Sequence, residues 1–274
     1  MTLLSVVQMN SQDDIDANFT VIESLIQQSK ADGAELIVFP ENFVCFAGGK
    51  QRETAAQFET IQQRLEHLAQ QYQIWIVAGT LPCPFRPDGS IIPDGRVRTV
   101  SLCISPERTE ARYDKIHLFD VHVGDAVGGY QESKFFEPGT DIVVAKTPFG
   151  HIGLMVCYDL RFPELALTLR AQGANILTAP AAFTYTTGQM HWQLLLQARA
   201  IDSQCHVLGA AQQGWHGEKR QTWGHAGASH SRGQILAITE AEGAQLITVP
   251  FDLQEQQAIR ASMPLIQHRK LMTL

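Results

Sequence analysis

Five cysteines are the strongest candidates for covalent chemistry in this sequence, and one of them occupies a special position. Cys157 ends the apolar segment 152–157, and a helix is expected to begin close behind it, because Pro163 suits a first helical position. A thiol at such a strand-to-helix turn has the placement of a nucleophile elbow. The positive end of the helix dipole also favours its thiolate form. Cys157 is therefore our candidate nucleophile.

The other four cysteines have simpler explanations. Cys103 and Cys205 lie within or beside apolar segments and are expected to fill the core. Cys83 lies between two prolines in a loop, and Cys45 follows Glu41 by four residues without polar neighbours. The number of cysteines is odd and no pair has C-x-x-C spacing, which argues against a disulfide framework or a zinc ribbon and favours a reducing compartment.

A nucleophilic thiol needs a base, and a developing oxyanion needs a cation or a hydrogen-bond donor. Glu41 follows the apolar segment 34–39, and Lys115 follows a second expected strand and opens a long loop with several glycines. Beyond the carboxyl ends of parallel strands, such residues would share one rim with Cys157. Taken singly, Glu41 also fits a capping or solvated loop carboxylate, and Lys115 a surface lysine. The ten histidines, none of which lies in a distinctive local pattern, leave open a cysteine–histidine hydrolase on another fold.

Two alternating spacings of apolar residues define the elements that must position these groups. Helices are expected at 15–26, 58–72, 163–173, 191–204 and from 253; strands are expected at 1–9, 34–39, 74–78, 98–104, 109–113, 142–145, 152–157, 176–179, 207–211, 234–239 and 245–249. Alternating strands and helices indicate a sheet covered by helices, which is an α/β fold. About twelve strands exceed one twisted sheet, so two packed sheets are expected. No linker composition interrupts the chain, so we expect one domain spanning residues 1–274.

Composition excludes several classes of protein. The chain has 274 residues, a net charge of −7, 45% hydrophobic residues and 18% charged residues, which is not the composition of a disordered chain. The acidic balance and the absence of a basic stripe argue against nucleic acid as a partner. No signal-like start and no apolar run of about 18 residues is present, so we expect a cytoplasmic protein without a membrane partner.

Three segments carry a resemblance to a known family. FPENF around Glu41, YDKIHLFD around Lys115 and GLMVCYDLRFPEL around Cys157 are similar, in this order, to the signature segments of the nitrilase superfamily of carbon–nitrogen hydrolases. The resemblance implies a four-layer α-β-β-α sandwich and a Glu-Lys-Cys triad that works without a metal or an organic cofactor. It also implies that the backbone N–H of Tyr158 assists at the oxyanion, that Glu132 holds the lysine, and that the protein forms a homodimer or a higher homo-oligomer.

Further segments resemble one branch of this superfamily, the branch of the omega-amidases and the amidases of deaminated glutathione. The segment around His191 resembles both, whereas HGEKR at 216–220 is closer to the second. The resemblance implies hydrolysis of a small anionic amide, deaminated glutathione, to 2-oxoglutarate and cysteinylglycine. An omega-amidase that uses 2-oxoglutaramate is the alternative. One departure is Ala226, which stands where the family commonly has serine.

A substrate with a carboxylate at each end requires cations in the pocket, since the average surface is acidic. Arg161 is the first candidate, because a guanidinium can bind a carboxylate through two hydrogen bonds. Arg161 could equally brace its own turn by pairing with Glu164 or Asp159. Further candidates for contact with the substrate are His191, Lys219 and Arg220. A protein that binds an anionic metabolite without reaction also remains open.

Overall fold

The computed structural model describes residues 1–124, 128–218, 220–240 and 242–271, and in these the strands form two large sheets and one small sheet. The larger sheet has the order β13-β12-β1-β2-β3-β4-β5, and β16 pairs with β1. Its strands are β1 (Thr2–Met9), β2 (Leu36–Val38), β3 (Trp75–Cys83), β4 (Arg98–Ile104), β5 (Thr109–Asp114), β12 (Ala211–His216), β13 (Arg220–Trp223) and β16 (Gln245–Phe251).

The second large sheet has the order β15-β14-β11-β10-β9-β8. Its strands are β8 (Val144–Thr147), β9 (Gly150–Leu154), β10 (Ile176–Thr178), β11 (His206–Gly209), β14 (Gly227–Ser229) and β15 (Ile235–Ile238). The helices are α1 (Ile15–Ala31), α2 (Gln51–Ala55), α3 (Phe58–Tyr72), α4 (Pro163–Ala171), α5 (Tyr185–Ser203), α6 (Leu253–Ser262) and α7 (Leu265–His268), with the 3₁₀ helices η1 (Glu132–Lys134) and η2 (Cys157–Arg161).

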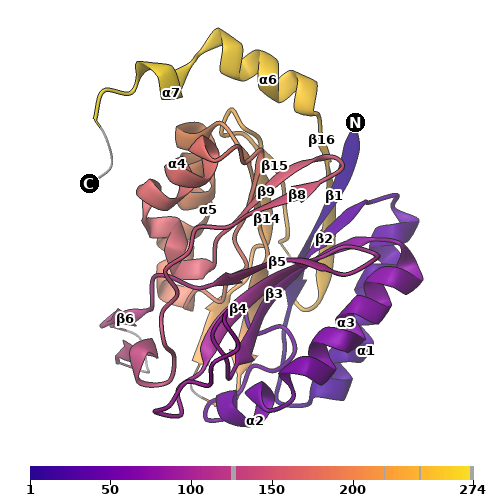
Figure 1. Cartoon of the computed structure of the whole chain (residues 1–274), viewed down its shortest axis with the longest axis vertical. Helices are drawn as coiled ribbons and strands as arrows, with labels where there is room; N and C mark the ends of the chain where they lie inside the picture. Colours follow the sequence, from indigo (N-terminus) through magenta and orange to yellow (C-terminus); the bar gives the residue numbers. More distant parts are fainter. Residues whose placement is uncertain (125–127, 219, 241, 272–274) are drawn as a thin grey trace.

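Successive side chains of a strand point to opposite faces of its sheet, which explains how the larger sheet packs against a layer on each side. On β1, Leu4 and Val6 belong to the apolar core between the two sheets, whereas Val7 and Met9 belong to a second core that the larger sheet forms with α1 and α3. Helices α4 and α5 cover the outer face of the second sheet. The expected four-layer α-β-β-α sandwich is confirmed (Figure 1).

Strand direction brings the candidate residues to one rim. Strands β1, β2 and β3 are parallel, and β5 runs in the same direction because β4 is antiparallel to both β3 and β5. In the second sheet, β9, β10 and β11 are parallel. Glu41 follows β2, Lys115 follows β5 and Cys157 follows β9, so each of the three comes after the carboxyl end of its strand.

Several element boundaries differ from the sequence-based expectation. The expected end of a strand at Gly79 is wrong: β3 continues to Cys83 with a shift of register between Ala78 and Leu81. Helix α5 begins at Tyr185, before its expected start, because Thr184 caps it by accepting a hydrogen bond from Thr187 N–H. Strands β12, β13 and β14 were not expected as separate strands, since β12 and β13 are largely polar and hide the alternation.

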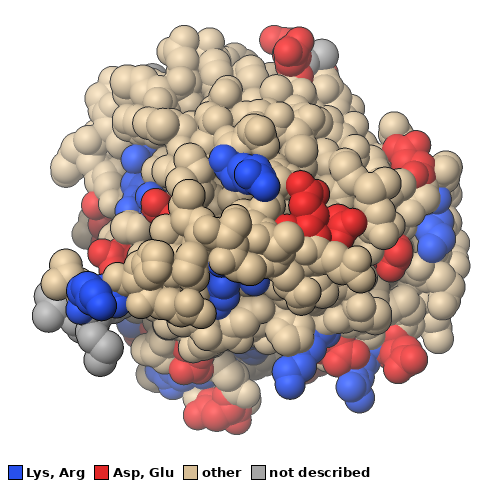
Figure 2. All heavy atoms as spheres, turned by 90° about the horizontal axis from the view of Figure 1, so that it is seen from above, with Lys and Arg blue, Asp and Glu red and all other residues tan. Residues whose placement is uncertain are grey.

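Charge is mixed on the face seen from the α6 end of the molecule. Lys and Arg side chains lie among Asp and Glu side chains, with broad uncharged areas between them on the described part of this face (Figure 2). In the described residues, no helix combines the length and the apolar character that crossing a membrane requires.

Gly79 allows β3 to pass close to the segment that carries Glu41. A Cβ at this position would lie 1.9 Å from the Pro40 carbonyl oxygen and 2.4 Å from that of Phe39. Gly79→Ala should therefore displace this backbone and destabilise the protein by about 2 kcal/mol, a usual cost of overpacking. Urea unfolding measures the loss. Gly48→Ala is the control, because nothing lies within 4 Å of the added Cβ; equal stability of the two variants would contradict the prediction.

Candidate active site

The Lys115 ammonium lies at the centre of the site and contacts two carboxylates. Its Nζ is 2.9 Å from Glu41 Oε1, and it lies 3.0 Å and 2.9 Å from the two oxygens of Glu132. Lys115 is 2% exposed and Glu41 is 5% exposed, so these charges have almost no contact with water. The structure thus brings together Glu41, Lys115 and Glu132 from three separate segments.

Burial and charge act in opposite directions on this cluster. Burial alone would lower the pKa of Lys115, but the charges of Glu132 and Glu41 outweigh it and raise that pKa well above the ordinary value. Burial raises the pKa of Glu132, with a further rise from Glu41, while Lys115 lowers it. Lys115 is therefore a permanent cation of the site.

Cys157 begins η2 with a backbone φ of +48°, a left-handed conformation that is unusual for a residue with a side chain. Its N–H donates to the Pro180 carbonyl at 2.9 Å. Glu41, Lys115 and Cys157 line the same cavity, and the two charged groups lie near enough to act on the pKa of the thiol.

The expectation that the surroundings of Cys157 favour its thiolate is wrong. Burial raises the pKa of the thiol well above its ordinary value, and the Glu41 charge raises it further, whereas Lys115 and the backbone of Ala182 only partly oppose this. Cys157 consequently rests as a thiol, so a base must take its proton before it can attack a substrate.

Glu41 is fixed through the chain on either side of it. Its carbonyl oxygen accepts a hydrogen bond of 3.1 Å from Gln212 Nε2, a side chain of β12. The N–H of Asn42, whose φ is +57°, donates to Thr80 Oγ1 at 2.9 Å. Buried contacts to β12 and β3 thus determine where the Glu41 carboxylate points.

Glu132 is positioned by the segment that follows it. One of its oxygens accepts a hydrogen bond of 2.7 Å from the Phe119 N–H. Further along, the Glu137 N–H donates to the Val97 carbonyl at 2.9 Å, and the Gly139 N–H donates to the Lys115 carbonyl at 2.8 Å. These bonds tie the segment that carries Glu132 to Lys115 itself and to Val97, the residue before β4.

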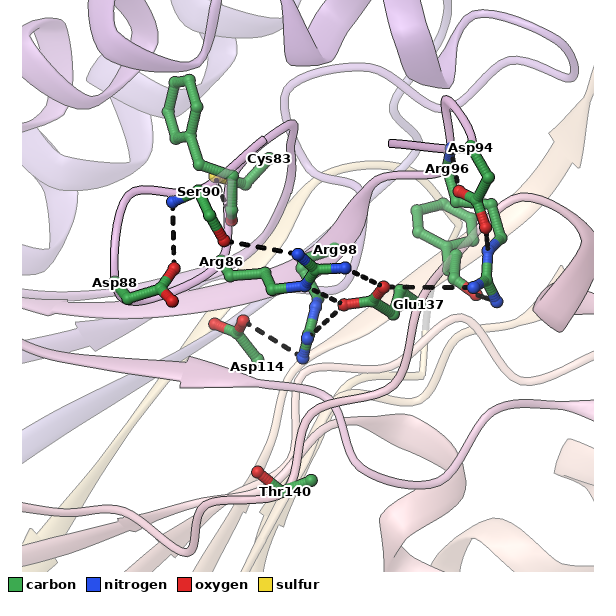
Figure 3. Close-up of polar contacts among 12 residues, drawn as sticks. Cys83, Arg86, Asp88, Ser90, Asp94, Arg96, Arg98, Asp114, Glu137 and Thr140 are labelled. Carbon is green, nitrogen blue, oxygen red and sulfur yellow. Dashed lines mark hydrogen bonds and ion pairs between the residues drawn. The ribbon is translucent and has the colours of Figure 1, made fainter. Parts of the chain in front are cut away.

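Glu137 anchors the same segment through arginines (Figure 3). Arg86 donates to both of its carboxylate oxygens, at 2.8 Å and 2.9 Å, and Arg98 donates to one of them. The hydrogen bond from Arg86, followed by that from Arg98, lowers the pKa of Glu137 to about 2 against the effect of burial. Glu137 is therefore ionised in the folded protein near neutral pH.

Arg161 does not brace its own turn. In the described residues it forms an ion pair with neither Glu164 nor Asp159, and its guanidinium nitrogens instead donate to His191 Nδ1 at 3.3 Å. Its guanidinium also lies 5.3 Å from the centre of the Phe183 ring. The expectation that Arg161 pairs locally is wrong, because Asp159 accepts hydrogen bonds from another part of the chain.

A cavity of about 620 Å³ opens over Cys157. Of the residues proposed to contact a substrate, Arg161 and Arg220 line this cavity, together with Tyr158. His191 is not among the described residues that line it and reaches it only through Arg161. Lys219 lies outside the described residues.

Arg220 lies against aromatic rings that sequence reasoning missed. Its guanidinium carbon is 4.5 Å from the centre of the Phe46 ring and 5.5 Å from that of Tyr130. Lys50 is a further cation on the wall. Neither arginine of the cavity forms an ion pair with another described residue, whereas the charge of Lys115 is already met by two carboxylates. The two arginines are therefore the cations best placed to receive an anion.

A metal site would require side chains of the described part of the chain that could together hold the ion. There, no group of three or more His, Cys, Asp or Glu side chains is arranged to hold a metal ion. A thiol beside a carboxylate and an ammonium is instead an arrangement suited to acyl transfer, in which a nucleophile, a base and an oxyanion partner lie together.

Comparison with known proteins gives a consistent result. The family model described as carbon–nitrogen hydrolase matches residues 3–261. A protein of Yersinia enterocolitica named deaminated glutathione amidase is 39% identical over 273 residues, which is 98% of this chain and 93% of that protein. A Synechocystis protein of the same name is 38% identical over 97% of both chains.

Solved structures agree with this result. The NitFhit protein of Caenorhabditis elegans has a TM-score of 0.87 and 33% identity, covering 98% of this chain and 65% of that one. The Nit3 protein of Saccharomyces cerevisiae, described as a member of branch 10 of the nitrilase superfamily, has a TM-score of 0.84 and 27% identity over 98% of this chain and 97% of that one.

Glu137→Gln should destabilise the protein by about 2 kcal/mol at pH 7, because it removes the anion and replaces one of the two oxygens that accept from Arg86 by an NH₂ group, which cannot accept. The pKa of Glu137 is lowered from 4.5 to about 2 in the folded chain, so the wild-type contribution is present above pH 4.5 and is lost as pH falls toward 2. The stability difference between variant and wild type should narrow over that interval.

Urea unfolding at pH 7, 5 and 3 measures this difference. Glu110→Gln is the matched control, because Glu110 pairs with Arg108, whose side chain is 73% exposed, and should contribute no more than about 0.5 kcal/mol. A difference for Glu137→Gln that stays constant from pH 7 to pH 3 would show that its charge is not the stabilising feature.

Proposed function

The chain belongs to the carbon–nitrogen hydrolase family, and from this premise we propose that it is an amidase that hydrolyses deaminated glutathione to 2-oxoglutarate and cysteinylglycine. The observation that carries the proposal is that Cys157, Glu41 and Lys115 line one cavity, with Lys115 bonded to Glu41, and that two arginines line it as well. The names of nearly full-length relatives supply the substrate.

In the proposed first half-reaction, Glu41 takes the thiol proton of Cys157 and the sulfur attacks the amide carbonyl carbon. Lys115 and the backbone N–H of Tyr158, in the first turn of η2, stabilise the oxyanion that forms. The carbon–nitrogen bond then breaks. Protonated Glu41 returns its proton to the departing amine, which leaves as cysteinylglycine.

The second half-reaction removes the acyl group from the sulfur. A thioester of 2-oxoglutarate remains on Cys157, and Glu41 takes a proton from water, which attacks the thioester carbonyl carbon. The carbon–sulfur bond breaks, 2-oxoglutarate leaves, and the proton returns to the sulfur. Glu132 holds the ammonium of Lys115 in place during both steps and transfers no proton.

Substrate selection follows from the cavity wall. Deaminated glutathione carries a carboxylate at each end, and Arg161 and Arg220 are two separate cations on the wall. His191 accepts hydrogen bonds from Arg161 and keeps its guanidinium oriented. A smaller amide such as 2-oxoglutaramate offers a carboxylate at one end only, which makes it the competing substrate to test.

Wild-type enzyme quenched during turnover should carry the acyl group of 2-oxoglutarate on the Cys157 peptide, as measured by mass spectrometry. Glu41→Gln should lower kcat by about 1,000-fold, because the base is lost and Lys115 loses one of its carboxylates. Cys157→Ala, which has no sulfur, is the control for the adduct. Near-normal turnover by Glu41→Gln would refute the role of the carboxylate.

Steady-state assays of wild type should give a higher kcat/KM for deaminated glutathione than for 2-oxoglutaramate, because only the first places an anion at both ends. Arg161→Met should raise KM for deaminated glutathione by about 10- to 100-fold, the value of a charge-assisted pair. Arg232→Met, an exposed arginine away from this cavity, is the matched control. A preference for 2-oxoglutaramate would assign the protein to the omega-amidases instead.

A further inference from the structure

One carboxylate joins the chain around Lys115 to the turn that carries Cys157. Asp159 is fully buried. Its Oδ2 accepts hydrogen bonds from Tyr113 Oη at 2.7 Å and from the Val156 N–H at 2.8 Å. Its Oδ1 accepts from the His117 N–H at 3.2 Å and lies 2.7 Å from His117 Nδ1. The Asp159 carboxylate thus joins residues 113–117 to the turn at Cys157.

These partners bracket the candidate reactive groups closely. Tyr113 and His117 stand two residues before and two residues after Lys115, and Asp159 stands two residues after Cys157. The Tyr113 hydroxyl also accepts a hydrogen bond from the Ile116 N–H at 3.3 Å. The path from the ammonium to the thiol therefore runs through a few buried bonds, so a change at Asp159 moves both groups relative to each other.

The same carboxylate closes the turn at Cys157. Asp159 Oδ2 binds the Val156 N–H, and the Asp159 N–H donates to the Val156 carbonyl at 2.9 Å. Between them Cys157 keeps its left-handed φ of +48°, a conformation that persists only where its surroundings impose it. The His117 ring also stacks on the Phe162 ring just beyond η2, with centroids 3.7 Å apart and planes within 7°.

We propose that Asp159 is a positioning residue for the hydrolysis proposed above: it fixes the separation and the alignment of Cys157 Sγ and Lys115 Nζ. The inference rests on that proposed function for its meaning, but its geometry is independent of the substrate. Asp159 is not among the described residues that line the cavity, so it acts through Tyr113, His117 and Val156 rather than on the substrate.

This role predicts a specific kinetic signature. Displacing reacting groups by about 1 Å costs on the order of 100-fold in rate. The arginines of the cavity wall keep anchors outside η2, because Arg161 is bonded to His191 of α5 and Arg220 belongs to β13. Asp159→Asn, which presents an NH₂ group to donors on one side, should lower kcat by about 100-fold and leave KM within about threefold. Tyr113→Phe, which removes one donor without changing shape, should lower kcat by about 10-fold.

Tyr72→Phe is the matched control. The Tyr72 hydroxyl donates to Glu23 at 2.8 Å on the outer helices, so this variant loses the same kind of hydrogen bond far from the site. It should lose stability but keep wild-type kcat. All variants are first compared by circular dichroism and by thermal unfolding, and Tyr113→Phe decides the question if Asp159→Asn does not fold.

The rate at which iodoacetamide alkylates Cys157, measured from pH 5 to pH 10 with mass spectrometry of the Cys157 peptide, supplies a readout without substrate. Glu41 and Lys115 are the charged side chains acting on this thiol, and Lys115 lowers its pKa. In Asp159→Asn and Tyr113→Phe the rate of alkylation should fall at each pH, because the ammonium that favours the thiolate is displaced. A purely structural role would reduce the amount of folded protein without changing the rate at which the folded protein is alkylated.

The outcomes separate the two proposals. Loss of kcat with KM retained, together with the lower rate of Cys157 alkylation, supports the positioning role. Folded variants with kcat within twofold of wild type and an unchanged alkylation profile overturn it, as does a loss of activity equal to the loss of folded protein. If the wild-type enzyme hydrolyses neither amide, the proposed function fails, and the alkylation profiles alone then decide the role of Asp159.

Discussion

The buried ammonium of Lys115 is the constraint on which the rest of the site depends. Removing a charged group from water costs several kcal/mol unless opposite charges and hydrogen bonds replace the solvent. Glu41 and Glu132 provide both, and they come from a strand end and from a distant loop. Burial, together with the charge of Glu41, raises the pKa of the Cys157 thiol more than Lys115 lowers it.

The paired sheets make this cluster possible. Glu41 and Lys115 follow strands of the larger sheet, and Cys157 follows a strand of the facing sheet, so no single sheet could supply all three. Loops at strand ends are usually mobile. Here they are restrained from outside the cluster, by the arginines around Glu137 on one side and by Asp159 on the other.

The sequence predicted Glu41, Lys115 and Cys157 at strand ends because apolar runs and alternating apolar residues locate strands. The direction of those strands follows from the alternation of strands and helices along the chain. The sequence could not give the pKa direction of Cys157, which depends on burial and on Glu41, more than a hundred residues away. It left open a pairing of Asp159 with nearby Arg161, although Tyr113 and His117 are its partners. Spacing along the sequence predicts pairs between neighbouring residues, whereas the buried hydrogen bonds here join distant segments.

Strands β12 and β13 were missed because their inward side chains, such as Gln212 and His216, are polar.

The charge balance of the cavity links this cluster to substrate choice. Lys115 has no charge to spare for a substrate carboxylate, because two glutamates already neutralise it. In the proposed function, Arg161 and Arg220, which belong to η2 and β13, receive the anion. A ligand with a carboxylate at one end would pair with one guanidinium and leave the other without an anion, which costs binding free energy. An amide with a carboxylate at each end would pair with both, so the arginine left unpaired by the shorter substrate would provide the discrimination.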